Sequence, residues 1–185
     1  MFAQETYILK PRQFINQEEM CKENKTFIDY FDLVFVPLVD SEKMNKYFWC
    51  KRDRRYVDTA IHLTFNEDTL LHKHVYETDL WGDLLSLVSR FIKFNFANVQ
   101  FTSTESYFSL VDLPNNTIQY SVKVTDSIFD FEIETILPKK EFVEFILLET
   151  IKFSELMIKS GFNKKYYEDR IKRATQWLYC VDFLN

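Results

Sequence analysis

The chain has 185 residues, a formal net charge of −5 and 46% hydrophobic residues, a balance typical of a soluble globular domain rather than a disordered chain. No apolar run approaches the roughly 18 residues that a membrane helix needs. Only two glycines, Gly82 and Gly161, occur beside 19 phenylalanines and 10 tyrosines. Because a P-loop, a dinucleotide-binding fingerprint and a nucleophile elbow each need glycines at fixed spacing, these kinds of catalytic site are excluded.

The N-terminal half of the chain predicts two strands followed by a helix. An apolar, β-branched run over residues 31–38 predicts a strand, which Pro37 restricts to a sheet edge. Residues 56–65 predict a second strand that ends in a turn. Thr78 or Asp79 can cap the helix that follows, in which apolar residues recur at spacings of three and four.

The C-terminal half predicts a three-stranded meander followed by two helices. Residues 107–113 and 117–124 flank a Pro-Asn-Asn turn and predict a hairpin, and residues 128–137 predict a third strand. A helix is expected over residues 138–160, because Pro suits a first helical position and apolar residues then line one face. A last helix is expected over residues 163–180.

Together these elements predict the fold class α+β, with an antiparallel sheet packed by two or three helices. We expect one domain over residues 1–185, in which the N-terminal third is a looser subregion. The helix over residues 138–160 should bury Phe142, Ile146 and Phe153 against the apolar face of the meander.

Charge and cysteine usage indicate the compartment and the kind of partner. Acidic side chains outnumber basic ones over residues 77–155, and the reverse holds over residues 156–185. Asymmetry of this kind bears on partners more than on fold. Three widely spaced cysteines and an N-terminus without the features of a signal peptide predict reduced thiols in the cytoplasm.

The third meander strand gathers three carboxylates on one face. Asp130, Glu132 and Glu134 alternate with apolar residues, and successive side chains of a strand point to opposite faces. One interpretation is a solvated face whose charges also keep an edge strand from pairing with other chains. The other is a row that binds a basic partner. Nothing nearby in sequence suggests a cleft or a group that would shift a pKa, so we expect no catalytic residue and no enzyme.

A basic cluster offers an alternative function. Lys51, Arg52, Arg54 and Arg55 could bind phosphate, and aromatic neighbours such as Tyr56 could stack on bases. The chain as a whole is acidic and has no second basic stretch to extend a nucleic-acid footprint. Charges between two strands also commonly form a solvated hairpin end, so nucleic-acid binding is kept as the alternative.

The histidines and cysteines are the remaining candidates for chemistry. His72 and His74 would share a face of an extended segment, and Cys50 could complete a soft metal site. Their spacing matches no zinc signature, so we predict no metal and no cofactor and interpret His62, His72 and His74 as surface histidines. The cysteines stand in aromatic contexts that favour buried, inert thiols.

The C-terminal half of the chain resembles small bacterial domains of the immunity-protein type. The resemblance rests on a strand that ends in Thr135-Ile136-Leu137-Pro138-Lys139-Lys140-Glu141-Phe142 and is followed by a helix that carries Phe and Glu. The same region also resembles uncharacterised domains that occur near toxin genes. In such sequences the hairpin is preceded by a helix that begins with aromatic and acidic residues. Residues 79–84 form such a beginning here. The resemblance covers about residues 77–160. It implies a non-enzymatic protein that neutralises a toxin by binding, commonly through an acidic surface, and it assigns no site residue.

The sequence therefore predicts a cytoplasmic binding protein of the immunity or antitoxin type that contacts a protein partner through Asp130, Glu132 and Glu134, without a membrane. A nucleic-acid-associated accessory protein that uses residues 51–55 is the alternative. A third possibility is a structural or phage protein that assembles only with itself.

Overall fold

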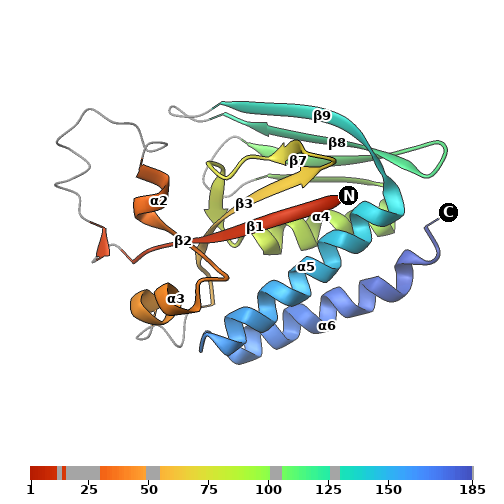
Figure 1. The fold of residues 1–185 in the computed structure, drawn as a ribbon. Helices are drawn as coiled ribbons and strands as arrows, with labels where there is room; N and C mark the ends of the chain where they lie inside the picture. Colours follow the sequence, from red (N-terminus) through yellow and green to blue (C-terminus); the bar gives the residue numbers. More distant parts are fainter. Residues whose placement is uncertain (12–13, 16–29, 49–54, 101–105, 126–129, 185) are drawn as a thin grey trace.

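The computed structural model describes residues 1–11, 14–15, 30–48, 55–100, 106–125 and 130–184, and the structural statements below concern these residues. Within them the chain forms two antiparallel sheets and five helices (Figure 1). The fold class is α+β, as the sequence predicts, although two sheets are present where one was expected.

The first sheet is built mainly from the N-terminal half of the chain. Its strands are β1 (Phe2–Leu9), β2 (Phe35–Pro37), β3 (Asp58–Phe65), β4 (Asp68–Leu71) and β5 (Tyr76–Thr78). The order is β2-β1-β3-β4, and β5 pairs with the other end of β3. Asn66 and Glu67 form the tight turn between β3 and β4 and both have positive φ angles. The second expected strand, over residues 56–65, is thus confirmed as β3.

Two short helices flank β2, namely α2 (Phe31–Val34) and α3 (Ser41–Phe48). The strand expected over residues 31–38 is therefore wrong in its first half. Phe31 and Val34 are both 2% exposed, so one turn of helix buries two apolar residues three positions apart. Its second half is β2, which lies at the sheet edge as Pro37 predicts.

The second sheet follows the predicted meander closely. Its strands are β6 (Phe96–Gln100), β7 (Tyr107–Leu113), β8 (Thr117–Val124) and β9 (Phe131–Pro138), in the order β6-β7-β8-β9. The bounds predicted for the hairpin are those of β7 and β8. Asn115 and Asn116 both have positive φ in the turn, which Asn tolerates better than most residues. Part of the range 128–137 expected for the third strand lies outside the described residues, and the described part is β9.

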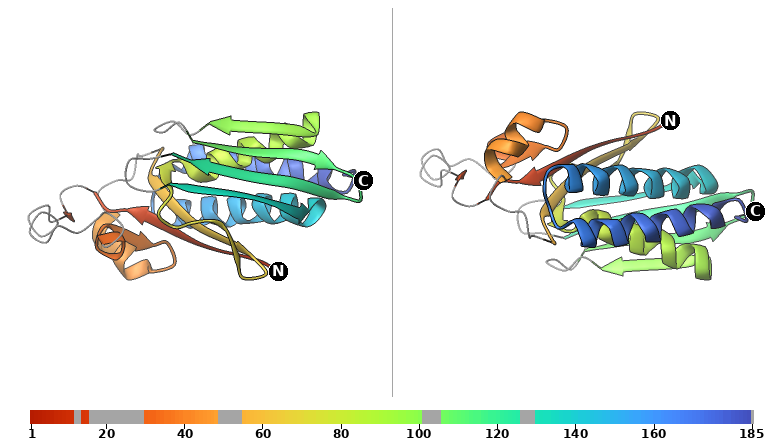
Figure 2. Two further views of the ribbon diagram at one scale, coloured as in Figure 1. Left: turned by 90° about the horizontal axis from the view of Figure 1, so that it is seen from above. Right: turned by 90° about the horizontal axis from the view of Figure 1, so that it is seen from below.

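Three helices, α4 (Leu80–Phe94), α5 (Lys139–Lys159) and α6 (Lys164–Val181), lie on one side of the second sheet. Figure 2 shows the strands in front of the helices from above, and α5 and α6 in front of the strands from below. No described helix covers the other face of this sheet. Phe142, Ile146 and Phe153 of α5 are at most 3% exposed, which confirms the predicted packing.

The ends of the helices also follow local signals. Pro138 precedes α5 by one residue instead of starting it. Gly161 has a φ of 83° and follows Ser160, the C-cap of α5, and the Phe162 N–H donates to the Met157 carbonyl, so the predicted glycine stop is confirmed. At the start of α6, the Asn163 side chain accepts a hydrogen bond from the Tyr166 N–H.

Buried polar contacts join the two sheets and the helices into one core. The Trp81 indole of α4 donates to the Thr6 hydroxyl of β1 over 3.1 Å. The Tyr120 hydroxyl of β8 donates to the Leu70 carbonyl of β4 over 3.2 Å. The first sheet is therefore held against both the second sheet and the helix layer by satisfied polar groups as well as by apolar packing.

Candidate functional site

The predicted acidic row lies on the uncovered face of the second sheet. Glu132 and Glu134 are exposed on β9, and Asp130 is exposed just before the strand begins. Glu132 pairs across the ladder with Lys123, whose ammonium lies 3.2 Å from the Glu132 carboxylate. This hydrogen bond raises the pKa of Lys123. The row is therefore exposed as predicted, but one of its charges already has a basic neighbour.

We call this uncovered side of the second sheet the open face, and the strand register shows which other residues lie on it. Moving along the strands, the cross-strand rows change from charged to polar to largely apolar. The rows are Gln100–Tyr107–Lys123–Glu132, Asn98–Ser109–Ser121–Glu134 and Phe96–Val111–Gln119–Ile136. Phe96 and Ile136 are 53% and 63% exposed at the two edges of the last row. The open face thus combines carboxylates at one end with exposed apolar side chains at the other.

A second candidate site, which the sequence did not reveal, is a cavity of about 710 Å³ between α4 and α6. Its floor contains Asp79 and Asp83 from the start of α4 and Arg170 from α6. Tyr166 and the exposed Tyr56 form a wall, with ring centroids 5.3 Å apart. We call this space the α4–α6 cavity.

A buried ion pair holds the floor of the α4–α6 cavity together. Arg170 Nη2 lies 2.6 Å and 2.5 Å from the two carboxylate oxygens of Asp79. The Tyr166 hydroxyl donates to Asp79 Oδ2 over 2.6 Å and accepts from Arg170. The Arg170 guanidinium also lies over the rings of Tyr166 and Tyr167, and its side chain is only 4% exposed.

The backbone around Asp79 is shaped for this pair. Asp79 precedes α4 with a φ of 66°, and its side chain makes no capping hydrogen bond. The sequence therefore identified the position of Asp79 correctly but not its role, because its carboxylate bonds to Arg170 instead. A Cβ atom at Gly82 would lie 2.4 Å from Asp79 Oδ2. One of the two glycines of the chain thus stands where the carboxylate needs space.

Asp83 is the second carboxyl group of the cavity floor. Burial, and then the charges of Asp79 and Glu77, raise the pKa of Asp83 to about 7. Its Oδ2 atom is buried and has no hydrogen-bond partner within the described part of the chain, and the same is true of Arg170 Nη1. The cavity floor therefore holds two carboxyl groups and one guanidinium, and one acceptor and one donor among them have no partner in the described part of the chain.

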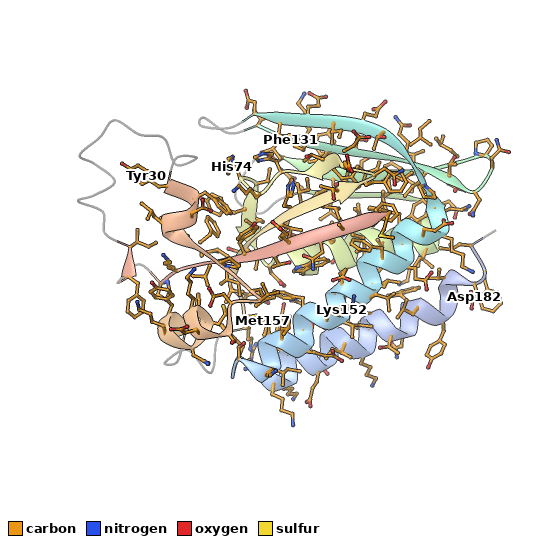
Figure 3. The ribbon with its side chains drawn as sticks, viewed as in Figure 1. Tyr30, His74, Phe131, Lys152, Met157 and Asp182 are labelled. Carbon is orange, nitrogen blue, oxygen red and sulfur yellow. The ribbon has the colours of Figure 1, made fainter. Side chains whose placement is uncertain are left out.

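The three histidines form a cluster instead of separate surface groups. The ring of His72 lies 6.0 Å from that of His62 and 4.5 Å from that of His74, between centroids. The cluster lies between α2 and the start of β9, where Figure 3 labels His74 and Phe131. Burial, followed by the charge of His72, lowers the pKa of His74 to about 4, and burial also lowers that of His72.

This arrangement corrects the expectation of surface histidines, since all three are half-buried. His72 and His74 lie in the turn between β4 and β5, not on an extended segment. Among the residues that the structure describes, no group of three or more His, Cys, Asp or Glu side chains is placed to hold a metal ion. Cys50, the proposed third ligand, lies outside the described residues.

Most of the predicted basic cluster also lies outside the described residues, namely Lys51, Arg52 and Arg54. Arg55 is exposed, and its carbonyl accepts a hydrogen bond from the Tyr167 hydroxyl over 3.2 Å. The C-terminal end of the cluster therefore reaches α6, close to the α4–α6 cavity.

In comparisons with known proteins, no family model, no curated protein and no solved structure matches this chain. Within the described residues, no helix is both long and apolar enough to cross a membrane.

Proposed function

We propose that this protein is a non-catalytic, cytoplasmic inhibitor of the immunity or antitoxin type, which binds a basic protein partner through the open face of the second sheet. The observation that carries the proposal is the exposure of Glu132 and Glu134 on a sheet face that no described helix covers (Figure 2). A sheet buried on one face normally presents polar side chains on the other, and this one adds carboxylates in line on its edge strand.

The chemistry of the open face suits a protein interface. Exposed carboxylates steer a basic partner toward the surface and set the salt dependence of association. Phe96 and Ile136 offer apolar area that a partner can bury, and aromatic side chains are enriched in interface cores. The Lys123–Glu132 pair is exposed, so it contributes little to stability and separates at small cost when a partner binds.

The test changes Asp130, Glu132 and Glu134 together to Lys. The melting temperature should stay within a few degrees, since exposed substitutions usually change stability by about 0.5 kcal/mol or less each. Capture of the partner from a lysate of the native cell, followed by mass spectrometry, should be lost, because like charges across an interface cost several kcal/mol. Equal capture by the triple-Lys variant and the parent protein would contradict the proposal.

A matched control makes the same change of charge elsewhere. Glu141, Glu144 and Glu155 are exposed on α5, away from the open face. Changing these three to Lys should leave capture intact if the open face is the interface. Loss of capture in both variants would indicate that only the net charge matters.

The nucleic-acid alternative keeps one specific observation in its favour. Tyr56 is 55% exposed next to Arg55, and it lines the α4–α6 cavity together with Lys172 and Arg173 of α6. A base could stack on this ring while the cations contact phosphate. Changing Lys51, Arg52, Arg54 and Arg55 to Gln should abolish RNA or DNA binding under this alternative and leave partner capture unchanged under ours.

A further inference from the structure

We propose that the α4–α6 cavity binds a small zwitterion of the α-amino-acid type, with its ammonium group against Asp83 and its carboxylate among Arg170, Lys172 and Arg173. This site is distinct from the open sheet face, and the proposal does not depend on the proposed inhibitor function.

The unsatisfied atoms of the cavity floor carry the argument. Arg170 Nη2 donates to Asp79 and Tyr166, while Nη1 of the same 4% exposed side chain has no partner among the described residues. Asp83 Oδ2 is likewise buried and without a partner. Leaving a buried charged group without a hydrogen bond is costly. Both side chains line the cavity, so a ligand that displaces them slightly on entry and supplies one cationic donor and one anionic acceptor would satisfy both atoms.

The other charges of the cavity agree with a ligand of both signs. Lys172, Arg173 and the acid Asp169 are exposed residues of α6 that line the cavity. A simple cation would be repelled by Lys172 and Arg173, and a simple anion would be repelled by Asp79 and Asp83. An amino acid places its ammonium at the acidic floor and leaves its carboxylate near the three basic groups of α6.

Size and lining also suit such a ligand. A volume of about 710 Å³ is within the range typical of small-molecule sites. The rings of Tyr56 and Tyr166 and the side chain of Leu85 line the cavity, so an apolar or aromatic side chain would find matching surface.

The experiment uses three probes that differ by one charged group, namely L-phenylalanine, 2-phenylethylamine and 3-phenylpropionate. Binding is measured above neutral pH, where Asp83 is ionised, by calorimetry or NMR titration. We expect L-phenylalanine to bind about tenfold or more tightly than either analogue, since each lacks one charge-assisted hydrogen bond. Equal affinity for L-phenylalanine and either analogue would overturn the proposal, as would the absence of binding by any free amino acid in a full panel.

Variants assign each half of the ligand to its side chain. Asp83→Asn should weaken binding of L-phenylalanine about tenfold but should not weaken binding of 3-phenylpropionate, which the Asp83 carboxylate repels. Changing Lys172 and Arg173 to Ala should weaken binding of L-phenylalanine and 3-phenylpropionate but should not weaken binding of 2-phenylethylamine. Glu168→Gln, at an exposed acid of α6 that does not line the cavity, is the matched control and should change neither. Unchanged affinity of Asp83→Asn for L-phenylalanine would overturn the assignment.

A second variant keeps the test independent of the polar network. Ser86 lines the cavity and is half-buried. Ser86→Phe should fill the cavity and abolish binding of all three probes without touching the Asp79–Arg170 pair. Probe binding that survives in Ser86→Phe would place the ligand elsewhere and contradict the proposed site.

Discussion

Arg170 of α6 donates to both carboxylate oxygens of Asp79, 91 positions earlier in the chain. The pair joins the last helix of the chain to the residue that precedes α4. Ion pairs that are buried this deeply give little net stability compared with apolar packing, but removing one partner leaves a desolvated charge behind. The contact therefore fixes how α6 lies against α4, and with it the shape of the α4–α6 cavity.

Arg170→Met is expected to lower the free energy of unfolding by about 3–5 kcal/mol, because Asp79 then stays buried without its cation. Urea denaturation measures the effect. The double variant with Asp79→Asn should lose less than the sum of the two single changes, since the second change removes the stranded charge. Additive losses would show that the two side chains are not coupled. Arg173→Met, on an exposed position of the same helix, is the control and should stay within about 0.5 kcal/mol.

Gly82→Ala is expected to destabilise the protein by about 1–3 kcal/mol, the usual range for overpacking. The new Cβ would lie 2.4 Å from Asp79 Oδ2, so the carboxylate would have to move away from Arg170. Ser86→Ala, one turn later in the same helix, should be nearly neutral in the same urea titration. A glycine inside an ordinary helix behaves oppositely, because Ala there stabilises by up to about 1 kcal/mol. A more stable Gly82→Ala variant would therefore mean that the close contact does not matter.

What could be predicted from the sequence follows the range of the interactions involved. The β7–β8 hairpin, α5 and its glycine stop depend on local period and turn chemistry, and their predicted positions agree with the structure to within a residue or two. The exposure of Glu132 and Glu134 also follows from period alone. Their neighbour Lys123 could not be foreseen, since it depends on the register between two strands.

Features that depend on distant partners were missed. Strand β1 pairs with β3 through residues more than fifty positions apart, and nothing local in its polar, alternating sequence indicates that partner. The α4–α6 cavity likewise depends on residues far apart in the sequence, since Asp79 and Arg170 are 91 positions apart. Its one local signal was Gly82 inside a helical pattern, because an isolated glycine there needs a packing reason.

Acid is expected to destabilise the protein partly through the histidine cluster. The pKa of His74 falls from 6.5 to about 4 on folding and that of His72 is also lowered, so the unfolded chain binds more protons below pH 6.5. Stability is therefore lost as the pH falls through this window. In urea titrations, the double variant His72→Gln with His74→Gln should become more stable relative to the parent protein as the pH falls from 6.5 to 4. Lys73 and Asp32 also face His74 and are present in both proteins. A difference in free energy of unfolding between variant and parent that stays constant across this pH range would contradict the lowered pKa values.

The same histidines are predicted to hold no stoichiometric zinc. A closed zinc site needs four ligands in tetrahedral geometry, and the described residues contain no group placed to supply even three. Elemental analysis of the purified protein measures this directly. A content of roughly one zinc per chain, lost on changing His72 and His74 to Ala, would show that the cluster rearranges around a metal.

Asp83→Asn should change how stability depends on pH. Burial raises the pKa of Asp83 from 3.8 to about 7, so between these values the folded protein holds a proton that the unfolded chain has lost. The contribution of Asp83 to stability is then fully present below the unfolded pKa and is lost as the pH rises through the folded pKa. Asn carries no such proton.

The difference in free energy of unfolding between Asp83→Asn and the parent protein should therefore be constant at low pH, shift in favour of Asp83→Asn as the pH rises toward 7, and level off above it. Urea titrations across this range measure the difference. A flat profile for Asp83→Asn would mean that Arg170 neutralises both carboxylates at once, and it would remove the unsatisfied acceptor on which the proposed ligand site depends.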